Sequence, residues 1–196
     1  MQQKRFLILV LGLAGILVLI ISLYGCKKNN TSPTPRPLDI NEDIDGNHYD
    51  TVRIGNQLWM VQPLRVTRFN DGTLIPNITD NAQWRAAISG ARCYYNNDSA
   101  TNAATYGALY NWYAVNTGKL APKGYHVADT SDFNTLINYL GGPGIAGQFL
   151  KSAHNWVGDA DSSYSSRNST GFTALPAGFR NFSGGFNYLG SNGYFW

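Results

Sequence analysis

The sequence has few charged residues, and its single glutamate, Glu42, stands out among the acidic ones. Charged side chains make up 14% of the 196 residues while aromatic side chains make up 13%, a balance that excludes disorder for most of the chain. The 15 basic and 12 acidic residues give a formal charge of +3 at pH 7. Because this surplus is small and is not gathered into a stripe, the sequence predicts no binding to nucleic acid.

Cysteine is also scarce, and the first of the two, Cys26, closes a long apolar run near the N-terminus. A basic pair, Lys4-Arg5, precedes this run over residues 6–23. The run ends in Leu-Tyr-Gly-Cys, which resembles a bacterial lipobox, where a small residue lets the signal peptidase cut and the thiol receives the lipid. The run also approaches the length of a transmembrane helix, so an uncleaved anchor is the alternative. The cysteine at its end favours a lipoprotein with residues 1–25 as signal peptide.

Lipidation of Cys26 would anchor the mature chain to a membrane through acyl chains such as palmitate. Lys27 follows, in place of the aspartate that retains many lipoproteins at the inner membrane, which favours the bacterial outer membrane and leaves the periplasmic or cell-surface face open. Residues 31–37 contain three prolines and predict an extended spacer. We therefore expect a lipidated tether over residues 26–37 and one folded domain over residues 38–196.

Metal and cofactor sites are not expected. Cys93 is the one cysteine left in the domain, so no disulfide can form there, and we expect it to be a small buried hydrophobic residue. The three histidines lack the spacing that places two imidazoles on one helix face, which argues against zinc. Asn41, Asp43 and Asp45 are spaced like the first ligands of an EF-hand, but Val52 stands where a bidentate glutamate is required. This favours a plain turn around Asp45 over a calcium site.

Turn residues and apolar spacing predict both strands and helices. Residues 48–54 and 57–61 flank Gly55-Asn56, a pair typical of a type II′ hairpin turn. A helix is expected from a cap at Thr79 or Asp80, with Trp84 and Ile88 four residues apart. Residues from 171 to 180 read as short strands separated by glycine turns.

Two further helices are predicted. One extends over about residues 105–115, where Tyr106, Leu109, Tyr110 and Tyr113 form one apolar face. The other begins after an Asp129 cap with Asp132 three residues later, and it ends at Gly141-Gly142. Its buried stripe consists of Phe133, Leu136, Ile137 and Leu140.

An ordered series of motifs resembles one family closely. In chain order the motifs are DIDGNHYDTVRIGNQLWM, FNDGTLIP, YNND, YGALYNWYAV, GKLAPKGYHV, NYLGG and GFTALPAGFR. On these, residues 43–196 are identified as a member of the Fibrobacter succinogenes major paralogous domain family, whose members are mainly secreted or lipid-anchored bacterial proteins of unestablished activity. The resemblance implies an α+β fold like that of C-type lectins and formylglycine-generating enzymes, with antiparallel strands, two to three short helices and long loops. Such a fold does not carry a function with it.

The chain departs from the family pattern at two places. Relatives often carry a cysteine where this chain has Ala121, which would partner the position of Cys93. The family also usually continues beyond its aromatic Gly-Tyr-Trp-Trp-like run, whereas this chain stops at residues 193–196. Because a missing edge strand would expose backbone hydrogen-bonding groups, we expect the sequence to be truncated at its C-terminus.

Catalysis is not expected either. Glycoside hydrolysis needs two carboxylates across a cleft, and no pair stands out in the sequence. Formylglycine generation would need a reactive cysteine arrangement that one cysteine does not supply. Cys93 and His126 could form a nucleophile and base only through space, and no local motif supports this. A secreted hydrolase or an enzyme remnant on the same fold is the alternative, and two aspartates converging in a pocket would favour it.

A binding role is suggested by aromatic and amide side chains, which suit sugar rings and their hydroxyls. The candidate ligand-binding residues are Tyr94, Tyr95, Asn96, Asn97 and Trp156. In the competing interpretation, most of the aromatic residues belong to the core. The sequence thus predicts a lipid-anchored, non-catalytic cell-envelope module that binds polysaccharide or a surface protein. A purely structural envelope protein is the second alternative.

Overall fold

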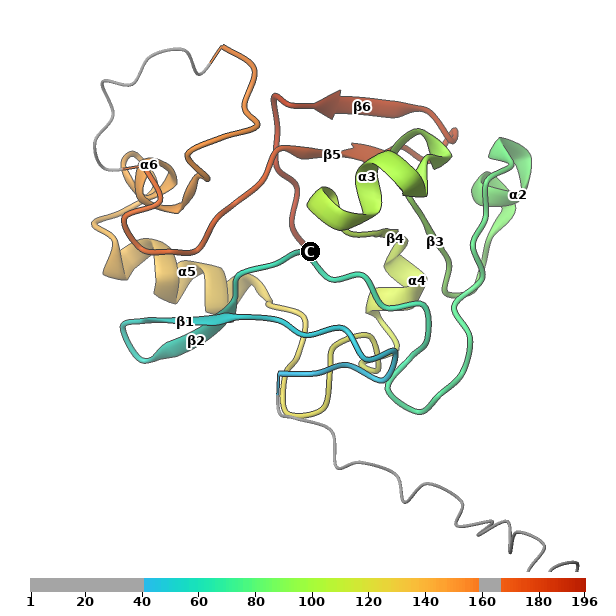
Figure 1. The fold of residues 1–196 in the computed structure, drawn as a ribbon, viewed down its shortest axis with the longest axis horizontal. Coiled ribbons are helices and arrows are strands. Elements are labelled where there is room, and N and C mark those ends of the chain that lie inside the picture. Colours follow the sequence, from blue (N-terminus) through green and yellow to red (C-terminus); the bar gives the residue numbers. More distant parts are fainter. Residues whose placement is uncertain (1–40, 159–166) are drawn as a thin grey trace, which may run out of the picture. The chain divides into compact units, whose positions relative to one another are not determined.

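The computed structural model describes residues 41–158 and 167–196, which form three two-stranded antiparallel sheets and several short helices (Figure 1). The predicted signal peptide, Cys26 and the tether lie outside the described residues. The strands are β1 (Thr51–Ile54), β2 (Gln57–Met60), β3 (Arg92–Cys93), β4 (Leu109–Tyr110), β5 (Ala177–Arg180) and β6 (Phe186–Leu189). The helices are α2 (Asn81–Ala86), α3 (Ser99–Tyr106), α4 (Trp112–Val115), α5 (Thr130–Tyr139), α6 (Ala146–Leu150) and the 3₁₀ helix η1 (Tyr95–Asn97). This confirms a mixed α+β architecture.

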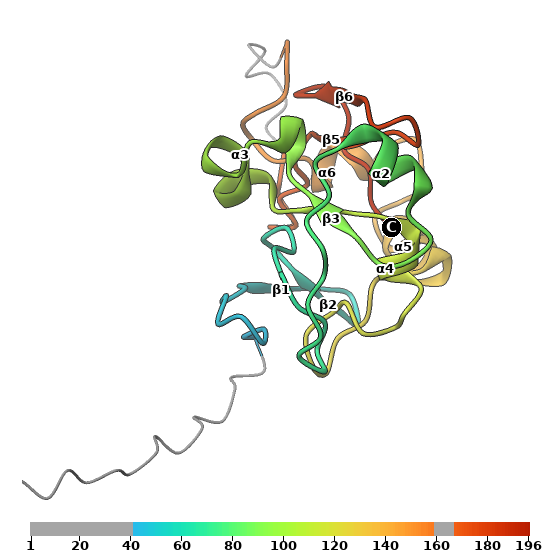
Figure 2. The same cartoon turned by 90° about the vertical axis from the view of Figure 1, so that its right-hand side faces the viewer.

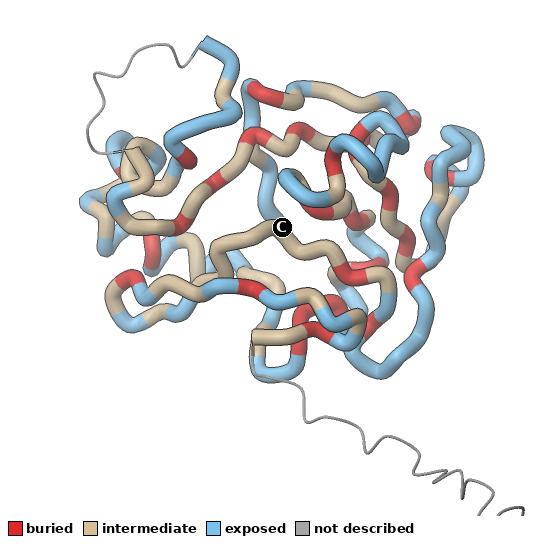
Figure 3. Tube along the Cα trace, viewed as in Figure 1, coloured by how far each residue is buried: buried red, intermediate tan, exposed pale blue. Residues whose placement is uncertain are grey.

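The three strand pairs lie at successive levels along the vertical direction of Figures 1 and 2. In Figures 1 and 2, the β3–β4 pair lies between the β5–β6 hairpin and the β1–β2 hairpin. Buried residues, marked red in Figure 3, come from strands, helices and the loops between them and form three apolar clusters. The clusters are centred on Ile75 with Tyr110, on Leu136 with Phe172, and on Trp84 with Cys93. No helix in the described part of the chain is both long enough and apolar enough to cross a bilayer.

The β1–β2 hairpin forms where the sequence predicts it. Gly55 has a φ of +58° and Asn56 follows with negative φ, as a Gly-first type II′ turn requires. The register pairs Ile54 with Gln57 and Val52 with Trp59. Trp59 is thereby fixed on β2, where it packs against the Leu136 cluster.

Helix α5 confirms the predicted capping box. The Asp129 carboxylate accepts hydrogen bonds from the amides of Ser131 and Asp132, and the Asp132 carboxylate accepts one from the Asp129 amide. Leu136 is fully buried on the core-facing side of the helix. Local sequence therefore decided both the start and the orientation of this helix.

Helix α2 begins at the predicted Asp80 cap but is shorter than expected. It ends at Ala86, so Ile88 lies beyond the helix with 83% of its surface exposed. The expected apolar pair of Trp84 and Ile88 is therefore wrong. Trp84 is instead buried alone on this helix, and its indole N–H donates to the Asn181 carbonyl.

The predicted helix over residues 105–115 is also wrong. Helix α3 starts earlier and ends at Tyr106, because the next residue, Gly107, has a φ of +68° and a ψ of −150°, which cannot continue a helix. The next residue, Ala108, donates its amide to the Leu64 carbonyl, and β4 then pairs with β3. A new helix, α4, starts at an Asn111 cap. Tertiary pairing thus overrides a helical apolar spacing in this segment.

Arg180 ties the C-terminal hairpin to the start of α2. Its guanidinium donates to the carbonyls of Ile78, Thr79 and Gly184 and to the Asn81 side chain. These four acceptors are all uncharged. These hydrogen bonds fix β5 against the start of α2. Phe179 precedes Arg180 on β5 and lies on the opposite face of the strand.

Candidate functional site

The described part of the chain contains a cavity of about 510 Å³. Its walls come from β2 and the residues after it, from residues 120–128, from the start of α5, from residues 172–177 and from residues 194–196. Most of these side chains are apolar or aromatic. A cavity of this size, with few polar groups in its wall, is typical of a site for a small ligand or part of a larger one.

An aromatic cluster forms one wall of the cavity. The Trp59 ring lies 5.4 Å from Phe133 and 5.3 Å from Phe172, and Phe195 lies 6.1 Å from each of these two phenylalanines, measured between ring centroids. The Trp59 Nε1 atom is buried and has no hydrogen-bond acceptor among the described residues. This wall therefore combines apolar faces with one unpaired donor.

A second aromatic group lies on the β5–β6 hairpin and the residues that follow it. Phe179, Tyr188 and Tyr194 form this aromatic platform, with ring centroids 4.7 Å apart for Phe179 and Tyr194 and 5.9 Å apart for Phe179 and Tyr188. The third pair, Tyr188 and Tyr194, is 6.5 Å apart. Tyr188 and Tyr194 are 55% and 50% exposed. The platform thus presents the rings of Tyr188 and Tyr194 to solvent. Packing of the hydrophobic core does not require rings at the surface.

The backbone at Tyr188 departs from a regular strand. Phe179 pairs with Asn187, so in a regular hairpin Tyr188 would point to the opposite face, with Arg180. Tyr188 instead has a φ of +64°, a conformation that is costly for a bulky residue. This departure accompanies the stacking of the Tyr188 ring on Phe179.

The platform and the cavity share a residue. Tyr194 belongs to the platform and also lines the cavity. Two residues on, Trp196 lines the cavity as well, donates its indole N–H to the Tyr110 carbonyl, and lies 5.8 Å from the exposed Trp112 ring. The two aromatic features therefore form one continuous candidate site.

The sequence-predicted binding residues lie elsewhere. Tyr94, Tyr95, Asn96 and Asn97 follow one another from the end of β3 through η1. Tyr95 is only 8% exposed and packs on Phe186, so its ring belongs to the interior. Tyr94 is half-buried with the Arg92 guanidinium 5.4 Å from its ring, whereas Asn96 and Asn97 are exposed. None of the four lines the cavity or belongs to the platform.

Trp156 is half-buried in the segment after α6. Its indole N–H donates to the Ser152 hydroxyl at 3.1 Å, and the Lys151 ammonium lies 4.5 Å from the ring centroid. A cation therefore already covers this ring. A ligand-binding role for Trp156, and for Tyr94, Asn96 and Asn97, stays a prediction.

Sequence reasoning did not single out Phe179 or Tyr188. A signal for Phe179 exists, because the strand Ala-Gly-Phe-Arg alternates in burial and Phe179 falls on the less buried side. No such signal exists for Tyr188, since simple alternation places its ring on the other face. The cavity arises from segments far apart in sequence and has no local signature.

One carboxylate, Asp132, lies on the cavity wall. The Asp129 amide and the His126 ring, whose Nε2 is 2.8 Å from Asp132 Oδ2, hold the pKa of Asp132 below its usual value. No second acidic side chain of the described residues lines this cavity. The two converging aspartates that would favour a hydrolase are not brought together here.

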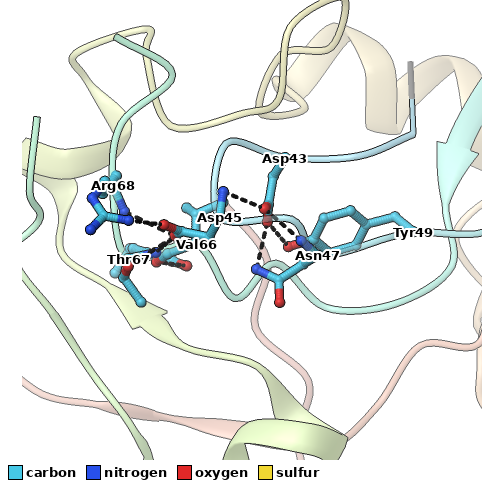
Figure 4. Close-up of polar contacts among 8 residues, drawn as sticks. Asp43, Asp45, Asn47, Tyr49, Val66, Thr67 and Arg68 are labelled. Atoms are coloured by element: carbon cyan, nitrogen blue, oxygen red, sulfur yellow. Dashed lines mark hydrogen bonds and ion pairs between the residues drawn. The ribbon is translucent and has the colours of Figure 1, made fainter. Parts of the chain in front are cut away.

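A buried carboxylate lies outside this site, in the turn that resembled a calcium loop (Figure 4). Asp43 is 1% exposed and accepts hydrogen bonds from the amides of Asp45 and Asn47, from the Asn47 side chain and from the Tyr49 hydroxyl. Burial and the bond to Asp43 raise the pKa of Tyr49 well above its usual value. These four donors engage both oxygens of the carboxylate, which makes Asp43 the centre of a structural turn.

The carboxylate of the neighbouring Asp45 is also bonded to protein groups. Its carboxylate accepts from the amide and hydroxyl of Thr67 and forms an ion pair with Arg68 at 2.8 Å (Figure 4). The predicted turn is confirmed by the bond from the Gly46 amide to the Asp43 carbonyl. Within residues 41–158 and 167–196, no three histidine, cysteine or acidic side chains converge as metal ligands.

Cys93 is fully buried beside Trp84 and Ala91, as predicted. Burial raises the pKa of its thiol, which disfavours the reactive thiolate. The His126 side chain is 73% exposed at the cavity wall. The structure therefore places Cys93 in a core cluster and His126 at the surface.

These features define a mixed α+β domain with an exposed aromatic platform beside an apolar cavity. A family model for the Fibrobacter succinogenes major domain matches residues 52–196, and the chain therefore belongs to that family. The match confirms the resemblance drawn from the sequence motifs and starts slightly later than residue 43. Comparisons with curated proteins and with solved structures found no match.

Proposed function

We propose that this chain is a lipid-anchored protein of the bacterial cell envelope whose domain binds polysaccharide without catalysis. The observation that carries the proposal is the aromatic platform of Phe179, Tyr188 and Tyr194, with two of its rings about half exposed. Aromatic rings provide flat apolar faces for the C–H groups of sugar rings, and a tyrosine hydroxyl adds a hydrogen bond. The exposed Tyr188 ring is held at a strained backbone position, which is not explained by stability alone.

The non-catalytic part of the proposal rests on the carboxylates of the site. Asp132 is engaged by the Asp129 amide and His126, and it is the one acidic side chain of the described residues on the cavity wall. Hydrolysis of a glycosidic bond requires an acid and a second carboxylate. The site thus favours binding over the alternative of a hydrolase. Its exposed platform and cavity also favour binding over a purely structural envelope role.

The anchor and the finer fold are part of the same proposal. Cys26 receives the lipid, residues 1–25 are the signal peptide, and residues 26–37 hold the domain away from the outer membrane. The domain adopts a C-type-lectin-like variant of the α+β architecture. Support comes from the lipobox-like sequence and from the short antiparallel strands joined by long loops.

Binding is tested with the full chain in detergent, on a glycan array and on insoluble polysaccharides. Tyr188→Asn removes a platform ring, and Tyr139→Asn removes an exposed tyrosine on α5 as the matched control. We expect saturable retention that Tyr188→Asn abolishes and Tyr139→Asn leaves intact, with both variants melting cooperatively. Tyr94→Ala and Trp156→Ala test the sequence-predicted residues in the same assay. A folded wild-type chain that retains no polysaccharide would overturn the proposal and favour a surface protein as partner.

The anchor is tested separately by metabolic labelling with a palmitate analogue in a Gram-negative host. The wild-type chain should carry the label and fractionate with the outer membrane. Cys26→Ala should lose the label, whereas Cys93→Ala should keep it because Cys93 is buried in the domain. Equal labelling of the wild type and Cys26→Ala would contradict the lipid attachment site.

A further inference from the structure

Two exposed indoles, Trp112 and Trp196, form a tryptophan pair outside the aromatic platform. Their ring centroids are 5.8 Å apart, and the two residues are 54% and 51% exposed. Trp196 is held by the hydrogen bond from its indole N–H to the Tyr110 carbonyl, and Trp112 is the first residue of α4, after the Asn111 cap. Exposed aromatic rings gathered at one place, with fixed positions, are typical of a binding surface.

The tryptophan pair continues the aromatic platform along the last residues of the sequence. Gly193 forms a β-bridge with Gly178 in β5, and the Tyr194 ring then packs on Phe179 of the platform. Trp196 follows two residues later, so its Cα atom lies at most about 7 Å from that of Tyr194. Tyr194 and Trp196 also line the same cavity. The platform and the tryptophan pair are therefore neighbouring parts of one aromatic surface.

The charges near this surface favour an uncharged ligand. Neither lysine nor arginine is among the described residues that line the adjoining cavity, and the Asp132 carboxylate there would repel an acidic polysaccharide. Among the described residues, Lys151 lies over the Trp156 ring, whereas no lysine or arginine lies over Trp112 or Trp196. Bare aromatic faces suit pyranose rings with equatorial substituents, whose two faces carry C–H groups. These features favour a neutral glycan of equatorially linked sugars.

The angles between the rings favour a single glycan chain. The planes of Trp112 and Trp196 differ by 41°, those of Phe179 and Tyr188 by 29°, and those of Tyr188 and Tyr194 by 34°. Rings that are not coplanar cannot all lie flat against one planar surface, such as the face of an ordered fibre. Successive units of a single glycan chain rotate about their linkages and can stack on such rings one after another.

We propose that the tryptophan pair is a second sugar-binding subsite, so that the domain binds several consecutive units of one neutral glycan chain. Some units stack on Tyr188 and Tyr194 of the platform, and units further along the glycan stack on Trp112 and Trp196. This inference rests on the proposed binding of polysaccharide. It adds glycan length as a determinant of affinity, because a ligand that reaches both subsites gains the contacts of both.

The inference is tested by isothermal titration calorimetry on the full chain in detergent. The probes are the dimers and hexamers of three neutral, equatorially linked series: cello-oligosaccharides, xylo-oligosaccharides and N-acetylchito-oligosaccharides. Trp112→Ala removes one ring of the pair, and Tyr113→Ala removes an exposed ring from the same helix as the matched control. In at least one series, we expect the hexamer to bind the wild-type chain at least tenfold more tightly than the dimer.

Trp112→Ala should weaken binding of that hexamer about tenfold and bring its affinity toward that of the dimer, since one stacking contact is lost. Tyr113→Ala should leave both affinities unchanged. Thermal melts check that both variants unfold cooperatively. If Trp112→Ala does not fold, Trp112→Leu replaces it, because leucine keeps an apolar side chain and favours a helix while removing the ring.

The outcomes separate this inference from the proposed function. Polysaccharide retention that depends on Tyr188, together with no hexamer binding, no gain from dimer to hexamer, or equal affinities of Trp112→Ala and Tyr113→Ala, overturns the inference and leaves the function in place. Absence of both retention and hexamer binding overturns the two together. Hexamer binding that is weakened by loss of the Trp112 ring and not by loss of the Tyr113 ring supports the inference.

Discussion

The guanidinium of Arg180 lies 4.5 Å from the ring centroid of Trp84, and both residues are buried. Phe186 lies on the guanidinium at 5.0 Å. All acceptors of this group are backbone carbonyls or an amide, so a flat cation is held between aromatic rings without a carboxylate. This contact joins α2 to the hairpin that carries the aromatic platform.

Arg180→Lys should destabilise the domain by about 3 kcal/mol. A lysine ammonium cannot reach the four acceptors that the planar guanidinium serves, so several of these carbonyl and amide oxygens would lose a donor. Urea denaturation of the two proteins measures the difference. Arg85→Lys, on the last turn of α2, is the control and should change stability little. Equal stability of Arg180→Lys and the wild type would show that the network is not required.

Gly107→Ala should be more destabilising than Gly118→Ala, although both glycines have a positive φ near +67°. A Cβ at position 107 would lie 2.5 Å from the Leu64 carbonyl oxygen, whereas position 118 has open space. Gly118→Ala therefore costs only backbone strain, about 1 kcal/mol, and Gly107→Ala costs that plus a clash with the backbone, about 3 kcal/mol in total. Thermal melts of the two variants test the difference, and equal loss would contradict the close approach.

Asp45→Asn should destabilise the domain at neutral pH and lose this effect in acid. Burial acts to raise the pKa of Asp45, but the hydrogen bonds from Thr67 and Arg68 together hold it below the usual value of 3.8. A lowered folded-state pKa stabilises the fold above the unfolded-state pKa, and this contribution disappears as the pH falls through the folded-state value.

The difference in unfolding free energy between the wild type and Asp45→Asn should therefore be about 1–2 kcal/mol at pH 7. It should shrink as the pH falls below about 4. Asp132, whose pKa is also lowered, titrates in both proteins and cancels in the comparison. Denaturant titrations from pH 7 to pH 2.5 measure the difference in unfolding free energy between the two proteins. A difference independent of pH would contradict the assigned role of the Asp45 carboxylate.

Tyr49→Phe should cost about 2 kcal/mol of stability. The Tyr49 hydroxyl donates to the buried Asp43 carboxylate at 2.6 Å and accepts from the Arg65 amide at 3.2 Å. Without it, a buried charge loses a donor and the half-buried Arg65 amide loses its acceptor. Chemical denaturation measures the loss, with the exposed Tyr139→Phe as control. If Tyr49→Phe matched the control, the Asp43 turn would be satisfied by its nitrogen donors alone.

Tyr188→Asn should be at least as stable as the wild type. Asparagine tolerates a left-handed backbone better than tyrosine, so relief of the strain at a φ of +64° outweighs the loss of the contacts that the half-exposed ring makes with Phe179 and Tyr194. The expected gain is about 1 kcal/mol, and a thermal melt measures it. A markedly lower melting temperature would show that the ring stabilises the hairpin, and would weaken the argument that it is retained for binding.

Local signals account for the elements that the sequence predicts correctly. The Gly55-Asn56 turn, the Asp80 cap and the capping box of Asp129 and Asp132 act within a few residues, so their backbone geometry follows from the side chains present. The burial of Cys93 follows from its small apolar side chain. The family motifs, which are also local strings, likewise identified the domain.

Tertiary contacts decided the segments that were predicted wrongly. Residues 105–115 have the apolar spacing of a helix, but Gly107 turns the chain against Leu64 and β4 pairs with β3. Hydrogen bonds from these amides to distant partners replace the hydrogen bonds that a helix would form. The spacing of apolar residues alone does not predict which of the two sets forms. The same holds for Ile88, which lies outside α2 because that helix ends at Ala86.

The sequence by itself determined the class of the domain, its capped helix and its first hairpin, and it indicated that aromatic side chains matter. It did not determine which rings reach the surface. Tyr95 was expected at a binding surface and lies in the interior, while Phe179, Tyr188 and Tyr194 meet on the outside because β6 is distorted at one residue. Rings from positions far apart can share a surface or a cavity only when the chain folds, and that choice depends on contacts that no local pattern contains.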